Sequence, residues 1–183
     1  MGVMIEQGLV QVYTGEGKGK TTAALGLALR TAGHGGKVLI YQFLKPPALE
    51  LGERGVIQEH IGSITMLALD EPWDMFESMG DQQAIGRVKT AIREAIHKVQ
   101  TDAHEKFYDL IVLDEIVFCL DKGLADIEDL KELIATRDPR VELVLTGRGA
   151  SRELIDLADL VTEMKEVKHY YEKGVQAREG IEK

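Results

Sequence analysis

Near its N-terminus the chain carries YTGEGKGKTTAALG at residues 13–26, which groups three glycines, two lysines and two threonines within eight positions. A glycine, four further residues and then Gly-Lys-Ser/Thr form a loop that binds phosphate groups. Counting back from the Gly-Lys-Thr at 19–21, the first position falls on Thr14, and the glycine stands one place later at Gly15. The stretch therefore matches the lysine end of a phosphate-binding loop and departs from the usual spacing at its first glycine.

The residue types in this loop suit polyphosphate binding. Its glycines allow backbone conformations that other residues disfavour, so that consecutive N–H groups can point inward at oxygens. Lys20 would place an ammonium group on the phosphates, and the hydroxyl of Thr21 would ligate a magnesium ion, with Thr22 as the neighbouring alternative. The predicted nucleotide-binding residues of the loop are Gly15, Glu16, Gly17, Lys18, Gly19, Lys20, Thr21 and Thr22.

Charged residues follow two later apolar runs. YDLIVLDE at residues 108–115 ends in Asp114 and Glu115, whose oxygens are the donors that Mg²⁺ prefers. LTGRG places Arg148 after another run, where its guanidinium can reach anions. Because the carboxyl ends of parallel strands meet at one edge of a sheet, we expect these groups to lie beside the loop. The sequence does not distinguish which of the two carboxylates contacts the metal.

Short apolar runs alternate with longer helical patterns along the whole chain. A glycine-rich loop between a strand and a helix, followed by further alternation, predicts an α/β fold: a P-loop NTPase-like (RecA-like), mostly parallel sheet with helices on both faces. We expect one nucleotide-binding domain over residues 1–183. The first helix is apolar almost all round, which predicts a buried helix. Strands are expected over 9–13, 37–43, 63–69, 108–115, 141–149 and 159–167, and helices over 21–31, 81–105, 127–135 and 151–158.

Composition excludes several kinds of partner. The net charge of −9 argues against nucleic-acid binding, which needs clustered lysine and arginine. No apolar stretch approaches the ~20 residues that span a bilayer, and the N-terminus lacks a signal-peptide pattern, so we expect no membrane partner and a cytoplasmic location. The single cysteine, Cys119, lies in the apolar run IVFCL, which favours a buried thiol and excludes an internal disulfide.

Three stretches together resemble the phosphate-loop type of ATP:corrinoid adenosyltransferase, also called cob(I)alamin or cob(I)yrinic acid a,c-diamide adenosyltransferase. The similarity covers nearly the whole chain and is densest at both ends, where Lys168 and His169 also match. The displaced first glycine is a trait of that family. The stretches are YTGEGKGKTTAALGLALRTAGHG, VLDE and LTGRGASRELIDLADLVTEMKEVKHYYEKGVQAREGIE.

The resemblance implies a reaction at carbon and not at phosphorus. A corrinoid reduced to Co(I) attacks C5′ of ATP and expels the triphosphate, so that no general base is needed. It implies that Lys18, Lys20 and the loop amides stabilise the leaving group, together with a magnesium ion on Thr21 and Glu115. Lys20, Thr21 and Glu115 are the catalytic residues this predicts. The resemblance further implies an external reductant such as a flavoprotein, and a homodimer.

The corrinoid side of the site is expected after the third strand. Family members carry Gly-Phe-Thr-Trp there, a segment that shapes the corrin pocket. The equivalent region of this chain reads LDEPWDMFES, in which Trp73 and Phe76 are the expected corrinoid-binding residues.

Two other functions use the same loop. One is a small-molecule kinase or ATPase, although the chain has no arginine cluster of the kind that closes over a transferred phosphate. The other is a non-catalytic nucleotide switch that binds partner proteins. The sequence leaves both open, and it does not define the natural corrinoid.

Overall fold

The protein is built around one six-stranded sheet. The computed structural model describes residues 5–74 and 78–182. All strand pairs within the sheet are parallel, and their order is β3-β2-β4-β5-β1-β6. The strands are β1 (Val10–Thr14), β2 (Val38–Gln42), β3 (Ile64–Ala68), β4 (Leu110–Asp114), β5 (Glu142–Thr146) and β6 (Leu160–Glu163).

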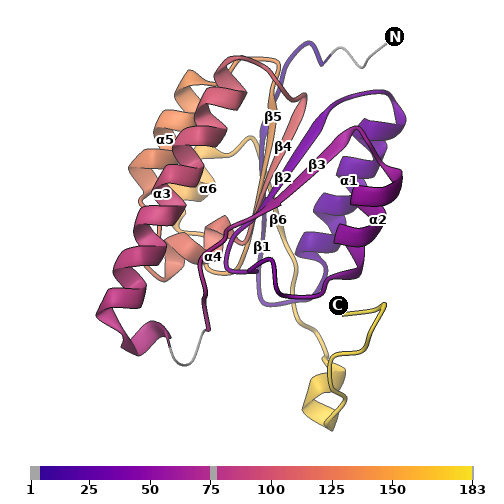
Figure 1. The fold of residues 1–183 in the computed structure, drawn as a ribbon, viewed down its shortest axis with the longest axis vertical. Helices are drawn as coiled ribbons and strands as arrows, with labels where there is room; N and C mark the ends of the chain where they lie inside the picture. The colour runs from indigo at the N-terminus through magenta and orange to yellow at the C-terminus, as the bar shows by residue number, and fades with distance from the viewer. Residues whose placement is uncertain (1–4, 75–77, 183) are drawn as a thin grey trace.

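Helices cover both faces of the sheet (Figure 1). One layer contains α3, α5 and α6, and the opposite layer contains α1 and α2. The predicted parallel α/β fold with helices on both faces is therefore confirmed. The helices are α1 (Lys20–Gly33), α2 (Gly52–His60), α3 (Gln82–His104), α4 (Ile116–Asp121), α5 (Ile127–Thr136) and α6 (Arg152–Leu157), with short 3-10 turns η1 (Ser78–Gly80) and η2 (Tyr170–Lys173).

Alternation along the strands divides the core between the two layers. Ile111 and Leu113 of β4 pack with the α3 and α5 side chains, whereas Leu110 and Val112 pack with those of α1 and α2. Successive side chains of a strand point to opposite faces, which explains this division. All five residues of β4 are buried. The carboxyl end of β4 is thus held rigidly in the middle of the sheet.

The prediction that α1 is buried all round is wrong. Only Lys20, Ala24 and Ala28 of this helix are buried, and Leu29 is 51% exposed. The small side chains of Ala24 and Ala28 face the sheet, while Ala23, Leu29 and Arg30 of the same helix are exposed. Apolar composition alone does not show which face of a helix has a partner.

The sequence analysis also missed α4. Its six residues are too few to show a helical period, and it begins at Ile116, directly after the turn that ends β4. Glu115 makes this turn with a φ of 70°, an uncommon conformation for a residue other than glycine.

Among the described residues no helix is both long and apolar enough to cross a membrane.

Cys119 lies in α4 and is fully buried, as expected. Burial raises the pKa of this thiol, and nearby Glu115 adds to the effect. Because thiol reagents attack the thiolate, we expect no labelling of the folded protein by a disulfide reagent at pH 8 and one equivalent in denaturant. The absorbance of the thiol released from the reagent measures the extent of labelling in both conditions. Rapid stoichiometric labelling without denaturant would contradict this prediction.

Candidate active site

The glycine-rich loop joins β1 to α1 and lies against the chain that follows β6. The Gly17 amide donates a 2.7 Å hydrogen bond to the carbonyl oxygen of Met164. A Cβ at Gly15 would lie 2.5 Å from that oxygen, and one at Gly17 would lie 2.7 Å from it. Gly15 and Gly19 also have positive φ values of 95° and 121°. Glycine is therefore required here by close approach as well as by backbone conformation.

Lys20, the first residue of α1, is only 8% exposed although it carries a charge. Its Nζ donates to the carbonyl oxygens of Gly15 and Gly17 at 2.6 and 2.8 Å. Burial lowers the pKa of this ammonium group, and the nearby Arg148 lowers it further. The loop thus curves around a partly desolvated cation, whose attraction for an anion is stronger than in bulk water.

Asp114 ends β4 beside the loop and is 1% exposed. The Thr21 hydroxyl donates to its Oδ1 at 2.8 Å, and the hydroxyl of Thr146 donates to the same atom at 2.7 Å. The structure therefore brings together the loop threonine and the strand-end carboxylate, which are 93 residues apart in sequence.

Glu115 follows on the same edge, and its backbone N–H donates to Thr146 Oγ1 at 3.0 Å. Burial is the main cause that raises the pKa of its carboxyl group. No three histidine, cysteine, aspartate or glutamate side chains gather into a metal-binding group within the described ranges. The donors at this edge are nonetheless hard oxygens, which fit Mg²⁺ if nucleotide oxygens and water complete its coordination.

Lys45 is a member of this cluster that the sequence analysis missed. Its Nζ lies 2.6 Å from Asp114 Oδ2, 3.1 Å from Thr21 Oγ1 and 4.0 Å from Glu115 Oε1. A signal was present in the sequence: the lysine follows the end of a strand, at the same edge as the other charged strand ends. The register of β2 beside β4, with Gln42 opposite Asp114, brings it to the carboxylates.

The remaining residues predicted to bind nucleotide line a cavity that opens over the loop. Arg148 Nε is 3.4 Å from Glu16 Oε2, and both side chains are more than half exposed. Lys18 donates to the carbonyl oxygen of Ile181 at 3.2 Å. Thr22 is exposed and faces the same cavity. Arg148 therefore lies at the loop as expected, although its ion pair is with Glu16.

A cavity of about 550 Å³ opens over the loop, within the usual size range of small-molecule sites. Trp73 lines it beside Leu44 and Phe118, and the indole Nε1 is buried with no hydrogen-bond partner among the described residues. His169, which matched the family without a role, also reaches this cavity. The other aromatic candidate, Phe76, lies outside the described residues.

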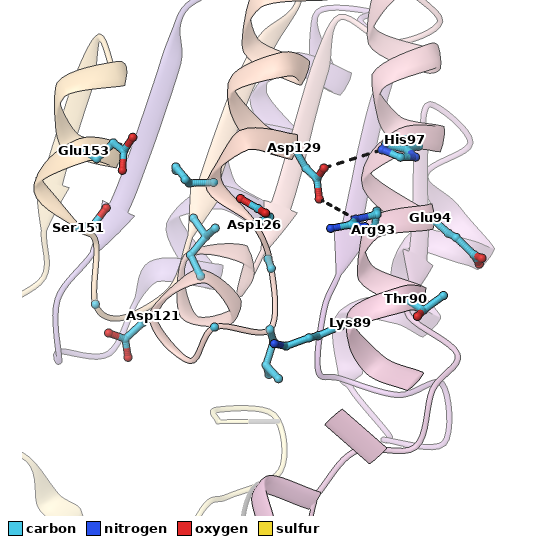
Figure 2. Close-up of a pocket in the computed structure, with 16 residues that line it drawn as sticks. Lys89, Thr90, Arg93, Glu94, His97, Asp121, Asp126, Asp129, Ser151 and Glu153 are labelled. Atoms are coloured by element: carbon cyan, nitrogen blue, oxygen red, sulfur yellow. Dashed lines mark hydrogen bonds and ion pairs between the residues drawn. The ribbon is translucent and has the colours of Figure 1, made fainter. Parts of the chain in front are cut away.

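A second cavity, of about 860 Å³, lies away from the loop between α3, the start of α5 and the start of α6 (Figure 2). In its wall Asp129 lies 3.4 Å from Arg93, with which it forms an ion pair, and 3.9 Å from His97. None of the predicted site residues lines it. We assign this cavity no role.

A glycine-rich loop between a strand and a helix, beside the acidic end of a parallel strand, defines a P-loop nucleotide-binding protein. Solved structures agree on the fold. The chain is similar to a KaiC-like protein from Pyrococcus horikoshii OT3, with a TM-score of 0.50 and 19% identity over 86% of this chain and 73% of that one.

The sequence relatives are more specific. The family model for ATP:corrinoid adenosyltransferase BtuR/CobO/CobP matches residues 6–182. The chain is 33% identical over 177 residues to the corrinoid adenosyltransferase of Escherichia coli K12 and to corrinoid adenosyltransferase CobA of Salmonella typhimurium LT2, covering 97% of this chain and 86% of each relative. The chain therefore belongs to the ATP:corrinoid adenosyltransferase family and is a transferase, which confirms the resemblance.

Proposed function

We propose that this protein transfers the 5′-deoxyadenosyl group of ATP to the Co(I) centre of a reduced corrinoid. In this reaction the cobalt electron pair forms a bond to C5′, and the bond from C5′ to the triphosphate oxygen breaks. The oxygen keeps the bonding electrons and leaves as inorganic triphosphate. The observation that carries the proposal is the loop cluster of Lys20, Thr21 and Asp114 in a chain that matches the family over residues 6–182.

The chain's own groups act on the leaving triphosphate. No proton is removed from Co(I), so the site needs no general base, only alignment and charge stabilisation. Lys20 and the loop amides would bind the polyphosphate, and Lys18 and Arg148, which line the same cavity, would add positive charge. Burial of Lys20 strengthens its contribution, because a desolvated ammonium binds an anion more tightly than an exposed one.

Magnesium is the proposed cofactor. Thr21 and one or both of Asp114 and Glu115 would hold it, and it would neutralise charge on the triphosphate oxygens. The donor set supports this, since the Thr21 hydroxyl contacts the Asp114 carboxylate, and the carboxylates of Asp114 and Glu115 both lie within 4.0 Å of Lys45 Nζ. We retain Glu115 as the predicted catalytic carboxylate.

The corrinoid is proposed to contact the apolar side chains of the cavity. Leu44, Trp73 and Phe118 are the apolar side chains in its wall. Aromatic and aliphatic side chains suit the face of a flat macrocycle. Phe76 remains a predicted member of this wall.

Three further features belong to the proposal. An external reductant, such as a flavoprotein, would supply Co(I), as the family resemblance implies. A homodimer is expected from the family resemblance. A cytoplasmic location is expected because the reaction needs a reducing environment that contains ATP.

One anaerobic assay tests the function. The protein is mixed with ATP, Mg²⁺ and cob(I)alamin, the visible spectrum is followed, and the phosphate products are separated. Adenosylcobalamin and inorganic triphosphate in equal amounts are the expected result. Formation of ADP would instead indicate a kinase or ATPase, and unchanged ATP would indicate a nucleotide switch.

A further inference from the structure

We propose that Lys45 competes with the divalent cation for the oxygens of Thr21 and Asp114, so that the metal binds tightly only together with nucleotide. The inference rests on the proposed function, because it concerns the same metal-binding edge. It assigns a positioning role to a residue that lies outside the glycine-rich loop.

The ammonium group of Lys45 already uses the donors that a cation would need. Asp114 Oδ2 accepts from Lys45 Nζ at 2.6 Å, while Oδ1 accepts from the hydroxyls of Thr21 and Thr146. Thr21 Oγ1 also accepts from Lys45 Nζ at 3.1 Å. Both carboxylate oxygens are thus engaged, and a metal that contacts Asp114 Oδ2 and Thr21 Oγ1 must take the place of this ammonium group.

The backbone at Lys45 is fixed, so the exchange involves only its side chain. Arg54 donates to the carbonyl oxygens of Lys45 and Pro46 at 2.7 and 2.9 Å and to Gln42 Oε1 at 2.8 Å. The lysine side chain is 20% exposed and has four flexible carbons, so it can turn toward the cavity that it lines. Polyphosphate oxygens bound in that cavity would then receive the displaced ammonium.

This arrangement links metal binding to nucleotide binding. A metal ion alone must separate Lys45 from a nearly buried carboxylate without giving the ammonium a new anionic partner. A metal ion that arrives with ATP brings that partner with it. Lys45 is therefore expected to weaken metal binding in the absence of nucleotide.

Mn²⁺ binding to the full-length protein without nucleotide tests the proposal, with free Mn²⁺ measured by electron paramagnetic resonance. Lys45→Met keeps the length of the side chain and removes its charge, and we expect it to tighten Mn²⁺ binding about tenfold, the factor equivalent to about 1.4 kcal/mol. Lys98→Met is the matched control, because it removes one exposed positive charge from α3, and it should leave Mn²⁺ affinity unchanged. Lys45→Arg retains the charge and should bind Mn²⁺ no more tightly than the wild type.

Thermal unfolding of each variant shows that it is folded. Lys45→Gln serves as the second variant if Lys45→Met does not fold, and it is expected to tighten Mn²⁺ binding in the same direction. A folded Lys45→Met or Lys45→Gln protein with wild-type Mn²⁺ affinity, or with no detectable Mn²⁺ binding, would overturn the proposal. The measurement involves neither corrinoid nor turnover, so its outcome is independent of the adenosyl-transfer assay.

Discussion

Replacing Lys20 with alanine is expected to lower kcat/KM for adenosyl transfer by roughly 10²–10³-fold, the effect of removing one preorganised group that stabilises developing charge. The ammonium of Lys20 lies inside the loop, within 2.8 Å of two of its carbonyl oxygens, where a polyphosphate would meet it in a partly desolvated setting. Anaerobic steady-state assays over a range of ATP concentrations measure the loss.

Two comparisons make the Lys20 result specific. Lys98→Ala removes an exposed lysine from α3 and is expected to leave kcat/KM unchanged. Lys20→Ala should retain the circular dichroism spectrum of the wild type, because its side chain contacts loop carbonyls beside the open cavity and not the apolar core. Turnover of Lys20→Ala within twofold of the wild type would remove this lysine from the mechanism.

Replacing Gly15 with alanine is expected to weaken ATP binding by at least about 100-fold, which corresponds to about 2.7 kcal/mol. The new Cβ would lie 2.5 Å from the carbonyl oxygen of Met164, and alanine would also have to adopt a φ of 95°. Because the clash is with backbone, the loop itself must move, and the hydrogen bond from the Gly17 amide to Met164 would be disturbed with it. Equilibrium titration with a fluorescent ATP analogue measures the change.

The chain offers a matched control for Gly15→Ala. Gly26 lies within α1, and a Cβ there would meet no atom within 4 Å. Gly26→Ala should therefore keep wild-type ATP affinity and raise the free energy of unfolding by about 0.5–1 kcal/mol, because alanine favours a helix more than glycine does. Wild-type ATP affinity in Gly15→Ala would show that the loop tolerates a side chain at this position.

Features encoded in neighbouring residues were predictable from the sequence. The loop before α1 and the LDE sequence at the end of β4 are local patterns, and the parallel topology follows from strand and helix alternation. These features were sufficient to expect the strand-end carboxylates beside the loop, and the structure places Asp114 Oδ1 2.8 Å from Thr21 Oγ1.

The features that were missed depend on contacts between distant segments. Lys45 reaches the carboxylates only because β2 pairs with β4 in one particular register. Which side of α1 is exposed depends on which elements pack against the helix, and the composition of the helix does not show this. Glu115 makes the turn after β4 with a positive φ, and no residue type in the sequence indicated that conformation.

The hydrogen bond between Gly17 and Met164 has a consequence for biosynthesis. The nucleotide-binding loop occupies residues 15–22, but β6 (Leu160–Glu163) and Met164, which support that loop, come much later in the sequence and are translated after the other five strands. A nascent chain on the ribosome therefore exposes a glycine-rich loop without its supporting wall until β6 and Met164 have emerged. The ability to bind ATP would then be acquired only after the other five strands of the sheet have had the chance to assemble.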